Sequence, residues 1–153
     1  MPEIAIVDAS ALIAMEKINL LDIICKLYDQ IILPEAVINE YGNPPIDCYS
    51  TKTVESTLLK LLESDLNLGK GESEVIALGR ETGIRIIIDD LKARKVAATL
   101  ELSVTGTIGI LLKAEKAGLI NSAHAKAREL RDKGFYVSDQ LLDDIDKRNV
   151  STK

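Results

Sequence analysis

The sequence is poor in the residues that stack on nucleic-acid bases and in those that bind zinc. It contains no tryptophan, one phenylalanine and one histidine. With so few aromatic side chains, base-stacking platforms are scarce, so any nucleic acid would have to be held mainly through its backbone. Cys25 and Cys48 lie far apart without CxxC spacing, and with His124 they cannot complete a zinc site. We therefore expect both cysteines to be reduced, buried thiols.

Long apolar runs are also absent. No apolar stretch approaches the ~18 residues that a membrane span requires, and no basic-then-apolar leader precedes the first predicted strand. We therefore expect a cytoplasmic protein without a membrane partner. The net charge of −5 argues at first against a nucleic-acid partner. That argument weakens if several acids surround divalent cations, because a bound metal reverses the local sign of the charge.

The length and composition fit one globular domain. The chain has 153 residues, of which 46% are hydrophobic and 28% charged, which is ordinary for a soluble protein with its own core. Short apolar runs alternate with helical patterns, which indicates βαβ crossovers. We predict an α/β fold, a three-layer α/β/α sandwich around a short, mostly parallel twisted sheet. This domain would occupy residues 1–148, followed by a frayed tail over residues 149–153.

The apolar patterns also predict the individual elements. Strands are expected over residues 4–7, 30–33, 85–88 and 102–104. Helices are expected over residues 9–16, 20–27, 35–41, 53–63, 72–82, 92–100, 107–117, 122–133 and 140–148. Gly83 stands where a helix-ending glycine should stand.

Acidic residues follow two of the predicted strands directly. Asp8 comes after the apolar run of residues 4–7, and Asp89 and Asp90 come after the run of residues 85–88. In open α/β sheets ligands bind beyond the carboxyl ends of the strands, and parallel strands bring those ends to one edge. Aspartate is also a preferred helix cap and turn residue, and for Asp8 that ordinary interpretation is about as good as the functional one.

Two glutamates lie on the apolar faces of predicted helices. Glu40 continues the apolar stripe of the helix over residues 35–41, and Glu72 lies on the apolar face of the helix over residues 72–82. A carboxylate on a core-facing stripe is costly unless something binds it. Glu74 points about 200° away from Glu72, given ~3.6 residues per turn, so we favour Glu72. The alternatives are a solvated helix end for Glu40 and, for Glu72, a first-turn acid that suits the helix dipole.

Together these acids form a candidate metal site. Its predicted ligands are Asp8, Glu40, Glu72, Asp89 and Asp90. Converging carboxylates repel one another unless cations neutralise them, and hard oxygen ligands select Mg²⁺ or Mn²⁺ over zinc. Such a site suits metal-assisted hydrolysis of a phosphodiester bond, because the metal lowers the pKa of a bound water.

Five motifs, taken in order, resemble the PIN-domain family. They are VDAS, LPEAVINEYG, GKGESEVIALG, IIIDDLKAR and VTGTIGILL, and the resemblance covers roughly residues 3–145. The chain is similar in particular to the branch of short archaeal and bacterial proteins related to VapC-type toxins. The resemblance implies a parallel sheet between helices and Mg²⁺- or Mn²⁺-dependent ribonuclease activity on RNA. It also implies frequent homodimers and, for the toxins, a cognate antitoxin.

The resemblance also implies roles for single residues. The family's acids fall on Asp8, Glu40, Glu72 and Asp90, with Asp89 beside the last of them. These acids would be the catalytic, metal-binding set.

Four further residues are candidates for contacts with the substrate. Ser10 would assist the metal ligands or donate to a substrate phosphate, and Thr107 would hydrogen-bond a metal-bound water or a phosphate. Lys92 and Arg94 follow the acidic pair directly and could hold flanking phosphates. The ordinary alternative for these two cations is a solvated helix face.

Two other classes of function compete with the nuclease. One is a catalytically silent RNA-binding or assembly module that keeps the fold. The other is a phosphoryl-accepting signalling module, which would need its paired acids after the first strand and a late lysine. Here the acidic pair follows a later strand and the lysine is absent, so the sequence disfavours this class.

Overall fold

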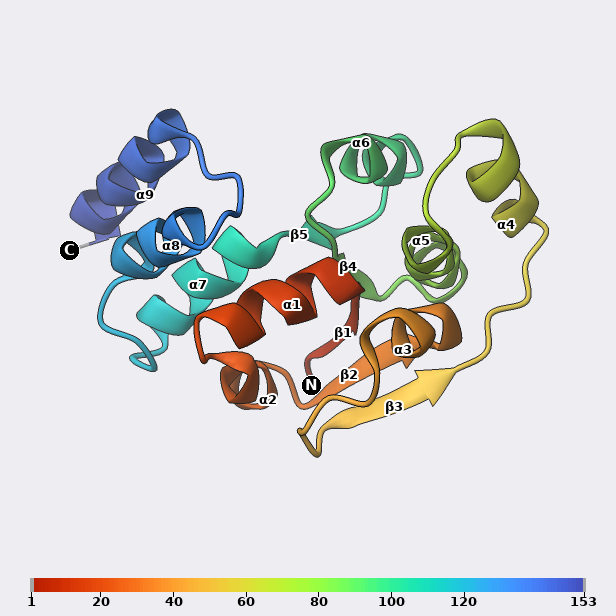
Figure 1. Cartoon of the computed structure of the whole chain (residues 1–153), viewed down its shortest axis with the longest axis horizontal. Helices are drawn as coiled ribbons and strands as arrows, with labels where there is room; N and C mark the ends of the chain where they lie inside the picture. The colour runs from red at the N-terminus through yellow and green to blue at the C-terminus, as the bar shows by residue number, and fades with distance from the viewer. Residues whose placement is uncertain (1, 153) are drawn as a thin grey trace.

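The computed structural model describes the backbone of residues 2–152 and the side chains of residues 2–147. Within this range the strands form one five-stranded sheet in the order β3-β2-β1-β4-β5, and every pairing is parallel. Helices lie on both sides of the sheet (Figure 1). The predicted α/β sandwich around a parallel sheet is therefore confirmed.

The central strands are buried on both faces. β1 (Ile4–Val7) lies between β2 (Gln30–Pro34) and β4 (Arg85–Ile87), while β3 (Tyr49–Lys52) and β5 (Val104–Thr105) form the two edges. The side chains of these strands that are fully shielded from solvent are Ala5, Ile6, Val7, Ile31, Leu33, Ile86 and Ile87. These runs are continuous rather than alternating because helices cover both faces of the sheet.

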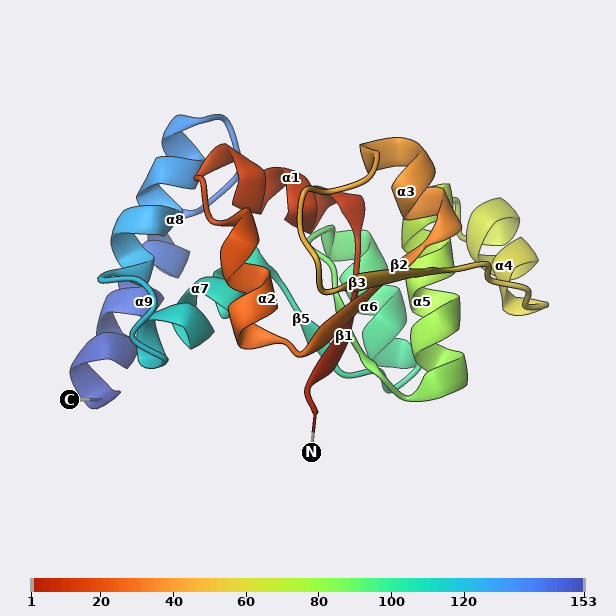
Figure 2. The same cartoon turned by 90° about the horizontal axis from the view of Figure 1, so that it is seen from below.

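The helices form two groups with the sheet between them (Figure 2). The first group holds α3 (Glu35–Tyr41), α4 (Leu58–Lys60), α5 (Lys70–Thr82) and α6 (Leu91–Thr99). The second holds α1 (Ala9–Lys17), α2 (Ile24–Leu27), α7 (Thr107–Lys116), α8 (Ala123–Asp132) and α9 (Asp139–Thr152), with α8 on α7 and α9 on α8. None of the helices in the described part of the chain is long and apolar enough to cross a membrane.

α5 is the helix that packs most intimately on the sheet. It contacts β1, β2 and β4. A Cβ atom at Gly79 would lie 2.5 Å from the Cγ2 atom of Ile86, so glycine is what allows this close approach. The helix ends at Gly83, whose φ of +76° is left-handed, as predicted for a C-terminal cap.

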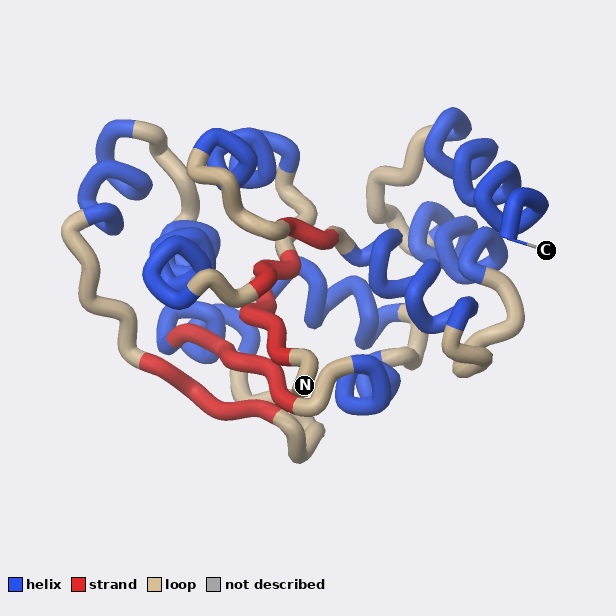
Figure 3. Tube along the Cα trace, turned by 180° about the vertical axis from the view of Figure 1, so that it is seen from behind, coloured by secondary structure: helices blue, strands red, loops and turns tan. Residues whose placement is uncertain are grey.

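The edge strand β3 was not predicted, and the helix expected over residues 53–63 was wrong at its start. Figure 3 shows β3 along the outer edge of the band of strands. Its residues are polar or partly exposed, so no apolar run marks it. Residues 53–57 are not helical: the Ser56 hydroxyl accepts a hydrogen bond from the backbone N–H of Leu58, where α4 begins. A π turn then continues to Asp65.

The C-terminal helix differs from its expected bounds. α9 runs to Thr152, beyond the predicted end at residue 148, so the helix extends over most of the predicted tail. Lys153, the last residue of that tail, lies outside the described residues.

The two cysteines form a disulfide, so the prediction of reduced thiols was wrong. Cys25 lies in α2 and Cys48 directly precedes β3, and their Cα atoms are 5.6 Å apart. The backbone N–H of Ile31 donates to the carbonyl oxygen of Cys48 at 2.9 Å, which fixes Cys48 beside β2. The sequence analysis missed the bond between Cys25 and Cys48 because it did not predict β3. This strand is what places Cys48 at the amino edge of the sheet, near Cys25.

Candidate active site

Asp8 stands at the centre of the carboxyl edge of the sheet. It directly follows β1 and takes the N-cap position of α1, but its side chain does not accept the capping hydrogen bond from that helix. Its Oδ2 atom accepts a hydrogen bond from the Ser10 hydroxyl at 3.1 Å. Its Oδ1 atom is buried and has no hydrogen-bond partner among the described residues. A helix cap therefore does not account for this side chain, which is only 3% exposed.

The carboxylates around Asp8 act on one another electrostatically. The pKa of Asp8 is raised to about 6, chiefly by burial and also by Glu72 and Glu40, while hydrogen bonds from Ala9 and Ser10 oppose the rise. The pKa of Glu72 is raised by burial, and then by Asp90 and Glu40. The predicted acids thus face one another, and a cation among them would favour their charged forms.

Three of these acids line one cavity at the edge of the sheet. The cavity of about 580 Å³ is bordered by Asp8, Glu40 and Glu72, together with Ser10. A Cβ atom at Gly71 would lie 3.2 Å from Oε2 of Glu40 and 3.4 Å from Oδ1 of Asp8. Glycine at this position therefore lets two carboxylates approach the same backbone. The sequence analysis did not select Gly71; its place directly before Glu72 is the signal that could have found it.

α3 brings Glu40 to this cavity, and an acid outside the cavity holds α3 in place. Pro34 occupies the N-cap of α3 and has no side-chain acceptor to offer. Glu74, buried on α5, accepts a hydrogen bond from the backbone N–H of Ala36 at 3.0 Å and satisfies the start of α3 instead. Glu74 does not line the cavity, in line with its predicted direction away from Glu72. It contributes to the placement of Glu40 on α3.

Glu72 both stabilises the start of helix α5 and lines the acidic cavity. It lies in the first turn of α5, and its Oε1 atom accepts a hydrogen bond from the backbone N–H of Gly69 at 3.1 Å. The alternative interpretation, a first-turn acid that suits the helix, therefore accounts for part of what Glu72 does. The charge of Lys92 lowers the pKa of Glu72, which places this exposed lysine within electrostatic reach of the acids.

The two aspartates after β4 have different partners. Asp89 accepts two hydrogen bonds from Thr107, one from its backbone N–H at 2.7 Å and one from its hydroxyl at 2.6 Å. Asp90 caps α6: its Oδ2 atom accepts from the backbone N–H of Ala93 at 2.9 Å. Asp90 raises the pKa of Glu72, whereas Asp89 does not contribute to that shift. Asp90 is therefore the member of the pair that acts electrostatically on Glu72.

Thr107 and Arg94 lie on the Asp89 side of the site. The hydroxyl of Thr107, which is buried, donates to Asp89 in this structure. A Cβ atom at Gly106 would lie 2.9 Å from Oδ1 of Asp89 and would clash with Nη1 of Arg94. Gly106 thus allows Asp89 and Arg94 to share one side of the site, a second glycine that the sequence analysis passed over.

A longer groove continues from the acidic cavity. The groove has a volume of about 1070 Å³, and Ser10 and Glu72 line both the groove and the acidic cavity. Asp90 and Arg94 border it near the sheet, and the segment before α9 borders it at the far end with Tyr136. The Tyr136 side chain is 87% exposed. The acids therefore open onto a groove whose lining runs from the sheet to the segment before α9.

The chemistry of the site fits a hard divalent cation, although the acids are not drawn together around one point. Across residues 2–147, no three histidine, cysteine, aspartate or glutamate side chains lie close enough together to hold a metal ion as they stand. The fit rests on an all-oxygen donor set, on the unpartnered Oδ1 atom of Asp8 and on carboxylates that raise one another's pKa.

Comparison with known proteins identifies the family. A search of curated proteins finds no match. A family model described as a PIN domain matches residues 4–149, which is nearly the whole chain. PIN domains are generally nucleases, and the parallel sheet between helices agrees with a PIN-like fold. The chain belongs to the PIN-domain family.

Proposed function

We propose that this protein is a Mg²⁺- or Mn²⁺-dependent endoribonuclease that hydrolyses RNA phosphodiester bonds. We further propose that it is the toxin of a toxin–antitoxin pair, or a stand-alone relative of such toxins, and that it acts in the cytoplasm as a homodimer. One observation carries the nuclease proposal: the buried Oδ1 atom of Asp8 lacks a partner in the described chain and lies in a cavity with Glu40 and Glu72.

Asp8, Glu40, Glu72 and Asp90 are the residues that would hold the ion in this proposal. A divalent cation bound there would supply an activated water and screen the negative charge of the phosphate. Ser10 orients Asp8 by donating to its Oδ2 atom, which leaves the Oδ1 atom for a ligand. The backbone N–H of Gly69 holds one oxygen of Glu72 in the same way.

The cations beside the acids would bind the flanking phosphates of the RNA. Lys92 is exposed and acts on Glu72 through its charge, and Arg94 borders the groove that leads away from the cavity. Two positive side chains next to an acidic centre would steer the substrate backbone without reading its bases. Thr107 contributes by holding Asp89, because both of its hydrogen bonds go to that carboxylate.

The test is cleavage of a labelled single-stranded RNA by the purified protein with and without Mn²⁺. Asp8→Asn should abolish metal-dependent cleavage because it removes the charge of the central ligand. Asp132→Asn is the matched control, since Asp132 is an exposed aspartate on α8 outside the site. Cleavage by Asp8→Asn at the wild-type rate, with the same dependence on Mn²⁺, would contradict the proposal.

A catalytically silent PIN module is the second candidate, and one observation favours it. In the part of the chain with described side chains, the acids do not converge closely enough to form a metal cluster as they stand. Isothermal titration with Mn²⁺ separates the two candidates. Binding that is lost in Asp8→Asn and kept in Asp132→Asn supports the nuclease, whereas no binding to the wild-type protein supports the silent module.

A further inference from the structure

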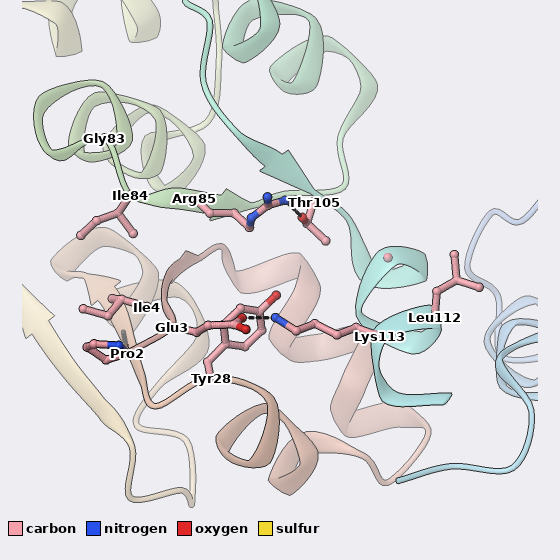
Figure 4. Close-up of a pocket in the computed structure, with 11 residues that line it drawn as sticks. Pro2, Glu3, Ile4, Tyr28, Gly83, Ile84, Arg85, Thr105, Leu112 and Lys113 are labelled. Atoms are coloured by element: carbon pink, nitrogen blue, oxygen red, sulfur yellow. Dashed lines mark hydrogen bonds and ion pairs between the residues drawn. The ribbon is translucent and has the colours of Figure 1, made fainter. Parts of the chain in front are cut away.

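A second cavity lies at the opposite edge of the sheet, where the strands begin. It has a volume of about 800 Å³, which lies within the range of small-molecule sites. Figure 4 shows residues from the start of β1, from the start of β4 and from α7 around it. Its apolar walls come from Pro2, Ile4, Ile84 and Leu112. None of the acids of the candidate active site lines it.

Two cations border this cavity, and one of them has no acidic partner. Arg85 donates one hydrogen bond to the Thr105 hydroxyl at 2.6 Å and makes no ion pair with any residue whose side chain is described. A guanidinium carries five N–H donors in a planar fork, so most of its donors stay available. Lys113 pairs with Glu3 and lies 4.3 Å from the centre of the Tyr28 ring.

The hydroxyl of a largely buried tyrosine faces the same cavity. Tyr28 lines it and is only 3% exposed as a residue, but its hydroxyl oxygen is not among the fully buried polar atoms and makes no hydrogen bond to another described residue. In Figure 4 the hydroxyl end of the ring points to the side of the cavity where Arg85 and Thr105 lie. Burial raises the pKa of Tyr28, and the charges of Lys113 and Arg85 oppose that rise, so both cations act on the phenol.

We propose that this cavity binds the phosphate group of a small organic phosphate. Arg85, Lys113 and Tyr28 line the cavity and bring two cationic groups and a hydroxyl to it, and a phosphate group has several acceptor oxygens to receive their hydrogen bonds. The carbon part of the ligand would lie against the apolar wall that includes Ile84 and Leu112. This inference does not rest on the nuclease activity, because none of the acids of the candidate active site lines this cavity; Thr105, Gly109 and Leu112 also line the longer groove.

Glu3 modulates the site by competing for Lys113. Its carboxylate forms the ion pair with Lys113, and its side chain is 57% exposed, so it can turn to solvent when another anion arrives. Removal of the Glu3 charge should therefore strengthen phosphate binding, the opposite of the effect expected for loss of Arg85. General attraction to positive charge would give the same two signs, so a cation outside the cavity is needed to separate it from a specific site: loss of such a cation should leave phosphate binding at a specific site unchanged.

The experiment is an NMR titration of the full-length ¹⁵N-labelled protein with ribose 5-phosphate, adenosine monophosphate, inorganic phosphate and acetate. We expect the phosphates to shift the amide signals of Arg85, Thr105 and Lys113, with the organic phosphates binding more tightly than inorganic phosphate. Arg85→Gln should weaken binding about tenfold or more, as expected for lost hydrogen bonds to a charged group. Tyr28→Phe should weaken it less, and Glu3→Gln should tighten it.

Arg80→Gln is the matched control, because Arg80 is exposed on α5 and does not line the cavity. The proposal is overturned if the phosphates shift no signals near Arg85, or if Arg85→Gln and Arg80→Gln weaken binding equally. Equal binding of acetate and phosphate would overturn the assignment of the ligand class. Because Tyr28→Phe keeps the buried ring and Glu3→Gln predicts a gain, a folding defect cannot reproduce the expected pattern.

Discussion

The two edges of the sheet differ in how their polar groups are satisfied. At the carboxyl edge, Asp8 keeps an unpartnered oxygen within the described chain and the neighbouring acids raise its pKa. At the amino edge, Glu3 pairs with Lys113 through its side chain and donates its backbone N–H to Asp29 at 2.6 Å. The disulfide also lies there, between α2 and the start of β3. Acids at the amino edge are therefore paired with donors, although Arg85 there has no acidic partner, whereas the acids at the carboxyl edge repel one another.

This difference shows where a cation would stabilise the protein. The buried Asp8 carboxylate is repelled by Glu72, which is half-buried, and by Glu40, which is exposed, so this edge is a candidate for binding a cation. Glu74, the buried acid that serves the fold, differs from Asp8: its Oε1 atom accepts from the N-terminus of α3, whereas the Oδ1 atom of Asp8 has no partner among the described residues. For these two buried acids, the hydrogen-bond partners separate the site residue from the structural one, and burial does not.

The largest expected effect is a difference in RNA cleavage between a variant at the carboxyl edge and a variant at the amino edge. Glu72→Gln at the carboxyl edge should lower metal-dependent RNA cleavage by about 100-fold or more, equivalent to roughly 2.7 kcal/mol of barrier. Arg85→Gln at the amino edge should change cleavage less than about twofold, because Arg85 lies outside the acidic cavity. Cleavage rates of the two variants on one labelled RNA provide the measurement. Equal losses would break the distinction between the edges.

The second prediction concerns how much the disulfide stabilises the amino edge. Replacement of Cys25 and Cys48 by alanine should lower the free energy of unfolding by about 3 kcal/mol, from the entropy of the loop that the bond closes. Urea denaturation of the double variant and of the wild-type protein with its disulfide intact measures this, and the wild-type protein in a thiol reductant is the control that should match the double variant. The folded double variant should keep its cleavage rate, since neither cysteine lines the acidic cavity. An unchanged urea midpoint would show that the disulfide does not stabilise this edge.

The third prediction concerns the repulsion at the carboxyl edge. The pKa of Asp8 in the folded protein is about 6, above its ordinary value of 3.8, so the folded state holds its proton longer than the unfolded state. The protonated form of Asp8 therefore adds to the free energy of unfolding, and this contribution is complete below pH 4. It is lost as the pH rises through 6, which lowers the free energy of unfolding by up to about 3 kcal/mol. Urea unfolding between pH 4 and pH 8, without divalent metal, should show this loss in the wild-type protein.

Asp8→Asn should reduce the loss, because asparagine does not titrate. The variant should therefore be more stable than the wild-type protein at pH 8 while it lacks activity. Identical pH profiles for the two proteins would show that Asp8 is not the group that titrates.

The smallest expected effect concerns the structural acid. Glu74→Ala should cost about 1–3 kcal/mol of unfolding free energy, because the buried N–H of Ala36 loses its acceptor. Glu74→Gln keeps an acceptor oxygen and should cost less. Thermal or urea unfolding of the two variants measures the difference, and Mn²⁺ titration checks that Glu74→Gln retains the site. A larger cost for Glu74→Gln than for Glu74→Ala would contradict the capping role.

The sequence predicted the parts of the fold that depend on local apolar pattern. The run at residues 4–7 is a strand and the run at residues 85–88 is a strand as far as Ile87, because β-branched residues covered on both faces leave an uninterrupted signal. The acids that follow them lie at the carboxyl edge for a topological reason, since all strands of the sheet run the same way. Asp8, Glu40, Glu72 and Asp90 are brought within electrostatic reach of one another as expected, and their catalytic role remains a prediction.

The parts that the sequence did not predict depend on contacts between distant segments. β3 is a polar edge strand, which forms because β2 offers it a partner and not because of its own pattern. The disulfide follows from that pairing. Gly71 is needed because Glu40 and Asp8 approach it, and its place before Glu72 indicates only that it lies near the site, not which carboxylates approach it.

The disulfide has a consequence for limited proteolysis. Gly42 and Asn43 are exposed and lie outside any helix or strand, in the kind of segment that proteases cut. A cut between them falls within the span that the bond from Cys25 to Cys48 closes, so the two fragments would stay covalently joined. The nicked protein would migrate as one band on a non-reducing gel and separate into two only after a thiol reductant is added.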